Sequence, residues 1–95
     1  MAAYFIVDVD VKNPREYEAY KQAAAASIAQ YGGRYLVRGG THEVLEGDWH
    51  PTRLVVLEFP SLAAAKRWYT SDEYSKVKPI RLQHAVGHLV LVEGI

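Results

Sequence analysis

The 95-residue sequence predicts one α+β domain of order βαββαβ, with a four-stranded antiparallel sheet that carries its helices on one face. Three observations predict this fold: alternating apolar residues near both ends of the chain, a strongly β-prone segment in the middle, and helical apolar spacing between these segments. At this length roughly 60–65% of the unfolded chain's surface can be buried, which is enough for one core. We therefore expect residues 1–95 to form a single domain.

The first strand and the first helix have clear boundaries. Tyr4 to Val11 alternates around two aspartates and is rich in β-branched and aromatic residues, which is typical of a strand. Asn13 and Pro14 then supply a cap and a first helical residue. Glycines at 32–33 end the helix, because glycine easily adopts a left-handed conformation at a helix C-terminus. The apolar residues at helical spacing are Tyr17, Tyr20, Ala24, Ile28 and Tyr31.

The middle of the chain predicts a hairpin. A second strand region runs from Arg34 to about Glu46, and Gly39-Gly40 inside it indicates a bulge or a bend. Residues 47–51 are typical of a turn, and the segment from Thr52 to Phe59 is strongly β-prone. The two strands are therefore expected to pair.

The last third of the chain predicts two helical pieces and a final strand. Ser61 is placed to cap a short helix, and Ser71 to cap a second piece that continues to Arg81. Pro79 conflicts with that second helix and is expected to kink or shorten it. Ala85 to Glu93 alternates as the fourth strand.

Both faces of the predicted sheet are apolar. The fourth strand places Val90 on one side and Leu91 on the other, and the third strand is apolar on both sides as well. A sheet with helices on only one face normally shows a polar opposite face to water. A second copy of the domain would cover the apolar face, so the pattern predicts a homodimer that pairs through its sheets.

Composition excludes several classes of function. Eleven basic and eleven acidic residues give no net charge, which disfavours nucleic acid and anionic membranes as partners. The chain has no cysteine, so disulfides, thiolate catalysis and sulfur-ligated metals are excluded. The first residues lack a basic start and an uninterrupted apolar run, so we expect neither a signal peptide nor a membrane span. We therefore expect a cytoplasmic protein.

Several sequence blocks together resemble the bacterial domain-of-unknown-function family 1330 over essentially the whole chain. That resemblance implies a dimeric α+β barrel, in which ferredoxin-like subunits pair through their sheets. It implies no activity, because the family has none assigned, and the wider superfamily spans cofactor-independent monooxygenases, haem-dependent enzymes and ligand-binding domains. The blocks are Gly32-Gly33-Arg34-Tyr35-Leu36-Val37-Arg38-Gly39-Gly40, Leu45-Glu46-Gly47-Asp48-Trp49 with Pro51 and Arg53, Glu58-Phe59-Pro60-Ser61, and Trp68-Tyr69 with Ser71, Glu73-Tyr74 and Arg81.

The glycine-bracketed arginines are the first candidate site residues. On a strand of period two, Arg34 and Arg38 would project from the same face. Arg38, beside the glycines, is the better candidate for holding an anionic ligand, with Arg81 as its partner. The alternatives are structural: Arg38 in an ion pair with Asp8, Glu46 or Glu58, and Arg81 in a surface salt bridge.

Asp8 lies in the middle of the first strand, where removal of its carboxyl group from water makes it a candidate general base. The competing interpretation is a permanently ionised partner of an arginine.

Aromatic residues predict either a pocket wall or simply core. Trp68, Tyr69 and Tyr74 would line an apolar pocket together with Tyr17 and Tyr20, because each of the tyrosines needs a partner for its hydroxyl.

The four histidines do not predict a metal site. His84 and His88 are four apart, but His88 falls within a strand pattern, where this spacing separates side chains by about 13 Å. We therefore expect no metal and no cofactor.

These features support two hypotheses of function. In the first, a homodimer binds a small, partly apolar or anionic organic molecule between helices and sheet. Arg38 and Arg81 would hold the anion, and Asp8 or a tyrosine such as Tyr20 would move protons in acid–base or cofactor-independent oxidative chemistry. Trp68 and Tyr74 would shape the pocket. In the second, the protein is a non-enzymatic dimeric module in which the arginines and acids form internal pairs.

Overall fold

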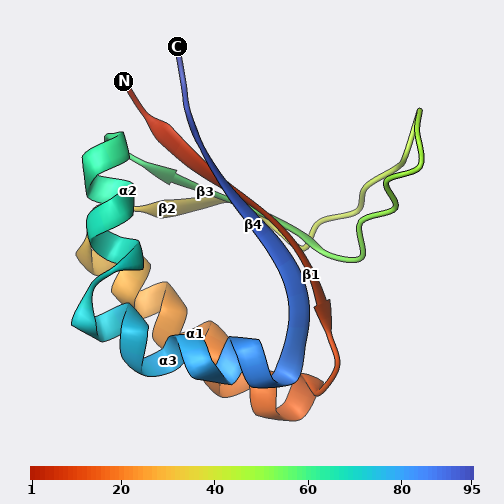
Figure 1. Cartoon of the computed structure of the whole chain (residues 1–95), viewed down its shortest axis with the longest axis horizontal. Helices are drawn as coiled ribbons and strands as arrows, with labels where there is room; N and C mark the ends of the chain where they lie inside the picture. Colours follow the sequence, from red (N-terminus) through yellow and green to blue (C-terminus); the bar gives the residue numbers. More distant parts are fainter.

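The computed structural model describes all 95 residues and shows one four-stranded antiparallel sheet with three helices on one of its faces (Figure 1). The strand order is β2-β3-β1-β4, so β1 lies inside the sheet between β3 and β4. This is a ferredoxin-like arrangement, and the predicted βαββαβ order is confirmed. The elements are β1 (Ala3–Val11), α1 (Pro14–Gln30), β2 (Arg34–Arg38), β3 (Leu54–Phe59), α2 (Leu62–Tyr69), α3 (Asp72–His84) and β4 (Ala85–Glu93).

The core lies between the sheet and the helices, because alternate residues of β1 and β3 turn their side chains toward the helices. Aromatic rings fill its centre: the ring centroid of Trp68 lies 4.2 Å from that of Tyr74 and 5.3 Å from that of Phe5. Large rings contribute most of the apolar area buried in such a core. The buried apolar residues are Ala3, Phe5, Val7, Val9, Tyr17, Ala24, Ile28, Val55, Leu57, Phe59, Ala64, Ala65, Trp68 and Tyr74.

The glycines after α1 end the helix as predicted. Gly32 has a φ of +82°, and its N–H bonds the carbonyl of Ala29, while the N–H of Gly33 bonds the carbonyl of Ile28. This paired pattern is the Schellman motif, which satisfies carbonyls left over at a helix end. A Cβ at Gly33 would lie 2.6 Å from the ring of Phe59, so the chain also passes close to the core here.

A serine caps the N-terminus of α2 and another caps that of α3, as predicted. The Ser61 hydroxyl accepts from the Ala64 N–H, and the Ser71 hydroxyl from the Tyr74 N–H, each at 3.1 Å. The expectation that Pro79 shortens the last helix is wrong, since α3 runs unbroken to His84. Pro79 is exposed and removes only one backbone donor, while packing against α1 supports the rest of α3.

The predicted second strand is too long. β2 ends at Arg38, and residues 39–53 form a loop without strand or helix that projects beyond the sheet (Figure 1). Gly39 has a φ of +71°, a left-handed conformation that turns the chain away from the ladder. The hairpin between β2 and β3 is nevertheless present, in antiparallel register.

A β-bulge in β2 reverses the expected orientation of its arginines. Tyr35 pairs with Leu57 and Val37 with Val56, so two steps on β2 match one step on β3 and Leu36 is the extra residue. The expectation that Arg34 and Arg38 share a face is therefore wrong. Arg38 falls on the helix side, whereas the Nε of Arg34 bonds Glu58 at 2.7 Å on the opposite side.

The helix-free face of the sheet carries exposed apolar side chains. Val90 of β4 pairs with Ile6 of β1. Val90 is 59% exposed to solvent and Ile6 is 38% exposed. Val92 is the next residue on the same face, and Val86 lies on it beyond His88. No helix of the protein combines the length and apolarity needed to cross a membrane.

Candidate functional site

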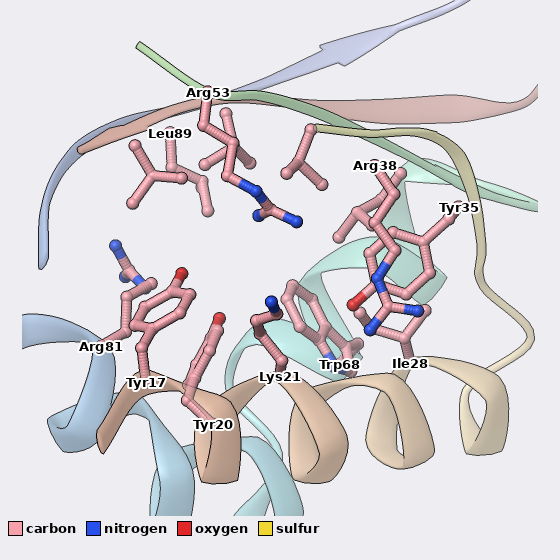
Figure 2. Close-up of a pocket in the computed structure, with 14 residues that line it drawn as sticks. Tyr17, Tyr20, Lys21, Ile28, Tyr35, Arg38, Arg53, Trp68, Arg81 and Leu89 are labelled. Carbon is pink, nitrogen blue, oxygen red and sulfur yellow. The ribbon is translucent and has the colours of Figure 1, made fainter. Parts of the chain in front are cut away.

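A narrow cavity lies between the sheet and α1, and Figure 2 shows the side chains that line it. The space free of protein atoms is about 490 Å³ including the open mouth, whereas the centre of a water molecule fits in about 40 Å³. The cavity therefore admits a slender group rather than a bulky one. Its lining residues are Val7, Val9, Tyr17, Tyr20, Lys21, Ile28, Tyr35, Arg38, Arg53, Val55, Leu57, Trp68, Arg81 and Leu89.

The walls follow directly from the strand and helix periodicities. Val7 and Val9 of β1, with Val55 and Leu57 of β3, form an apolar roof because they are the helix-facing residues of the two central strands. The opposite wall comes from one side of α1, which contributes Tyr17, Tyr20, Lys21 and Ile28 (Figure 2).

All charged side chains of the lining are cations. Lys21, Arg38, Arg53 and Arg81 line the cavity, and no aspartate or glutamate does. Lys21 has an acid partner outside the cavity, Glu18 at 3.3 Å, but the three arginines form no salt bridge. We call this space the cationic cavity. Unpaired cations on apolar walls raise the affinity of the space for an anion.

Arg81 is the most buried of these cations, with 7% of the residue exposed. Its Nε donates to the Tyr74 hydroxyl at 3.2 Å, and that hydroxyl lies 2.7 Å from the hydroxyl of Tyr20. Burial lowers the pKa of the Arg81 guanidinium, but its interactions with Tyr74 and Tyr20 outweigh burial and leave the pKa raised. Arg81 is therefore held in place and fully charged.

Trp68 is held by a buried hydrogen-bond chain. Its Nε1 donates to the Ser27 hydroxyl at 2.9 Å, and that hydroxyl donates to the carbonyl of Ala24 at 2.8 Å. Because all three groups are buried and paired, the indole forms a rigid wall of the cationic cavity.

The tyrosines of the cavity are hydrogen-bond donors rather than bases. Burial raises the pKa of Tyr17, Tyr20 and Tyr35 above the ordinary value of 10.0. Arg53 counteracts burial at both Tyr17 and Tyr35, without reversing the upward shift. At neutral pH these hydroxyls are protonated, so they can donate to an anion beside the cations.

The structure brings together four of the predicted site residues. Tyr20, Arg38, Trp68 and Arg81 all line the cationic cavity. Tyr74 stands behind Tyr20 and Arg81 and connects them. Arg38 makes no ion pair, and its Cζ lies over the ring of Tyr35, 4.4 Å from the centroid.

Asp8 does not line the cationic cavity, because it lies on the helix-free face of the sheet. Its carboxylate accepts from the Trp49 Nε1 at 2.8 Å and from the Thr52 N–H at 3.1 Å. The strand alternation that turns Val7 and Val9 into the cavity turns Asp8 away from it. The pairing of Asp8 with Arg38 is therefore excluded by the sheet between them. No three histidine, aspartate or glutamate side chains are grouped so as to hold a metal ion.

Sequence reasoning did not single out Lys21, Tyr35 or Arg53 as site residues. For Arg53 a signal was available: it lies two residues before Val55, so period-two alternation places it on the helix side. Tyr35 and Arg38 lie on the same face only because of the bulge at Leu36. No residue preference in the local sequence predicts that bulge.

The raised pKa of Tyr20 predicts a loss of stability in alkaline solution. Tyr20 ionises in the unfolded chain near pH 10.0 but only at higher pH in the folded one, so its contribution is complete below pH 10 and is lost as the pH rises above it. We expect the free energy of unfolding to fall by about 1.4 kcal/mol per pH unit for each tyrosine that ionises only on unfolding. Urea titrations from pH 8 to 11 and tyrosinate absorbance would measure this. In Tyr20→Phe the slope should be shallower by one such group, and ionisation of all seven tyrosines near pH 10 in the folded protein would contradict the prediction.

Solved structures similar to this chain share its fold at low sequence identity. A protein of unknown function from Rhodopseudomonas palustris has a TM-score of 0.79 and 20% identity, covering 99% of this chain and 82% of that one. SnoaB, a cofactor-independent oxygenase from Streptomyces nogalater, has a TM-score of 0.68 and 14% identity, covering 99% and 93%. A dimeric ferredoxin-like protein of unknown function from Jannaschia sp. CCS1 has a TM-score of 0.72 and 10% identity, covering 99% and 100%.

The similarity to these structures establishes the predicted ferredoxin-like, dimeric α+β barrel type of fold. Among curated proteins no match is found. The sequence profile of one family matches residues 2–95, almost the whole chain, and confirms the resemblance seen in the glycine and arginine blocks. The chain therefore belongs to the family described as "Domain of unknown function (DUF1330)".

Proposed function

We propose that this protein is a homodimer that binds a small, partly apolar organic anion in the cationic cavity of each subunit. The observation that carries this proposal is the lining itself: four cations, apolar walls and no carboxylate. The three arginines of the lining have no acid partner, and cations that share one cavity repel one another, which destabilises the folded protein. An entering anion would relieve this repulsion and form charge-assisted hydrogen bonds.

The walls support a ligand with a flat apolar body. Ten of the fourteen lining residues are hydrophobic, and they include the rings of Tyr17, Tyr35 and Trp68. Aromatic rings favour stacked or edge contacts with a planar group, and a cavity this narrow excludes a bulky one. A small aromatic or conjugated acid fits both the walls and the charge.

Chemistry in this cavity would start from a ligand that is already ionised. The lining contains no carboxylate and no histidine, its tyrosines are protonated, and its remaining polar side chains are cations, so it offers no group that removes a proton. The cations would instead stabilise negative charge that develops on the ligand. The structural similarity to a cofactor-independent oxygenase is compatible with oxidation of such an anion.

The second candidate is a binding module without turnover. The same scarcity of bases favours it, because a binding protein needs the cations and walls but no group that moves protons. Turnover of a bound ligand, assayed after binding has been found, separates the two candidates.

Ligand binding can be tested with matched acids and amides. We expect small aromatic acids to raise the melting temperature more than their neutral amides, and to shift the indole N–H resonance of Trp68 in NMR spectra. Arg38→Met should weaken binding of the acids about tenfold or more, since it removes one charged donor. Arg34→Met is the matched control, because Arg34 lies on the other face of the sheet, and it should bind normally. Binding only of neutral compounds, or no effect at Trp68, would refute the proposal.

The dimer is proposed to form through the helix-free face. Ile6, Val90 and Val92 expose neighbouring apolar side chains there, of the kind that mark a protein contact, and Val86 adds a further one beyond His88. A second copy is a suitable cover, because two such surfaces are self-complementary in a symmetric pair. The similar protein from Jannaschia sp. CCS1 is described as a dimeric ferredoxin-like protein, which supports this assignment.

A charge on this face should break the dimer. Val90→Lys places an ammonium group at the centre of the proposed contact, so light scattering should show monomer or aggregate where the wild type shows dimer. Leu82→Lys is the matched control, because Leu82 is similarly exposed, at 62%, but lies on α3, and it should stay dimeric. Leu91 is unsuitable for this test, because it packs against the core on the helix side. A soluble, unchanged Val90→Lys dimer would disprove the interface.

A further inference from the structure

Among the cations of the cavity, Arg53 differs from the other arginines in having no partner. Arg81 donates to Tyr74, and Arg38 stacks on Tyr35. Arg53 makes no hydrogen bond, ion pair or ring contact through its guanidinium, although the residue is half-buried. Figure 2 shows its side chain reaching from the sheet into the middle of the cavity. The two terminal nitrogens of its planar fork are therefore free to bind both oxygens of a carboxylate.

The backbone on either side of Arg53 is fixed. The carbonyl of Arg53 accepts from the N–H of Val9 at 2.9 Å, and the carbonyl of Leu54 accepts from the N–H of Gly39 at 2.8 Å. The first bond ties Arg53 to the central strand, and the second ties the start of β3 to the end of β2. The side chain therefore starts from a rigid point of the sheet, although Arg53 itself precedes β3.

Gly39 supplies the space in which the guanidinium lies. A Cβ at Gly39 would be 2.7 Å from the Nε of Arg53 and 3.1 Å from its Cζ and Nη2, which is closer than such atoms normally approach. Any side chain at this position would therefore push the guanidinium away. Gly40 differs, since a Cβ there meets no atom within 4 Å. Of the two glycines, only Gly39 must lack a side chain for the Arg53 guanidinium to occupy its place in the cavity.

The charge of Arg53 also acts on two tyrosines of the cavity. Its charge reaches Tyr17 on α1 and Tyr35 on β2, and it opposes the effect of burial on the pKa of both hydroxyls. Tyr17 and Tyr35 line the same cavity as Arg53, so their hydroxyls are further donors for a carboxylate bound there. Such an arrangement fixes both the position and the orientation of the anionic group.

We propose that Arg53 is the residue that anchors the ligand, by a bidentate contact to the carboxylate of a flat, unsaturated carboxylic acid, and that the missing side chain of Gly39 leaves the guanidinium the space this contact requires. The inference rests on the proposed binding of an organic anion, and it adds the identity of the anchor and the chemical class of the ligand. Arg53 acts on affinity and specificity, and Gly39 acts through Arg53 as a positioning residue.

The test uses benzoate and benzamide, which share a ring and differ in charge, with dissociation constants measured by NMR titration of the full-length protein. Wild type should prefer benzoate, and in Arg53→Met the affinity for benzoate should fall by about tenfold or more, while that for benzamide changes by less than about threefold. Arg53→Lys keeps the charge but loses the planar fork, so it should restore only part of the preference. Arg34→Met should match the wild type.

Gly39 is tested by a double-mutant cycle, because Gly39→Ala also strains a left-handed backbone position. Gly39→Ala should weaken benzoate binding in the wild-type background and have no such effect in Arg53→Met, where no guanidinium remains to be displaced. An equal effect in both backgrounds would overturn the role of Gly39.

The possible failures are distinguishable. A preference for benzoate that persists in Arg53→Met would overturn the anchor while leaving the binding function intact. If neither probe binds the wild type, the proposed function fails and the inference fails with it.

Discussion

The alternation of side chains along a strand is the constraint on which the rest of this structure depends. Each residue of β1 faces either the helices or the open side of the sheet, and because β1 pairs with strands on both sides, its alternation sets that of its neighbours. Val7 and Val9 thereby become the roof of a cavity, and Asp8 is placed behind it. One extra residue at Leu36 shifts the alternation in β2 and brings Arg38 into the cavity. The charges that meet in this protein are thus selected by backbone geometry.

The cationic cavity is costly to the folded protein without a ligand. Arg81 is buried, and its only side-chain partner is an uncharged phenol. The structure offsets this cost by linking the guanidinium to a chain of two tyrosines, and by leaving Arg38 and Arg53 partly in contact with solvent. Such an arrangement is expected where stability is given up for a preorganised site, as the proposed function requires. It also separates the two roles of the sheet, since the cavity lies on one face and the proposed dimer contact on the other.

Much of the fold could be predicted from the sequence, because caps and apolar periodicity are local signals. The final strand was predicted with the bounds Ala85–Glu93 that the structure shows, and the serine caps at 61 and 71 were located correctly. Tyr20, Arg38, Trp68 and Arg81 were also identified as candidates before the structure placed them together. The remainder depended on tertiary geometry. The bulge at Leu36 could not be predicted, because leucine has no preference for bulges. The alternation of β1 predicts that Asp8 and Val7 lie on opposite faces of the sheet, but it does not predict which face the helices cover.

The central claim is that the free guanidinium of Arg53 receives a carboxylate inside the cationic cavity. A crystal structure of the protein with bound 4-bromobenzoate tests it most directly, because the anomalous signal of bromine locates the ring independently of the surrounding density. The account predicts bromine within the cavity and both carboxylate oxygens within hydrogen-bonding distance of Arg53. Bromine on the helix-free face, or a carboxylate turned to solvent with Arg53 still unpaired, would contradict it.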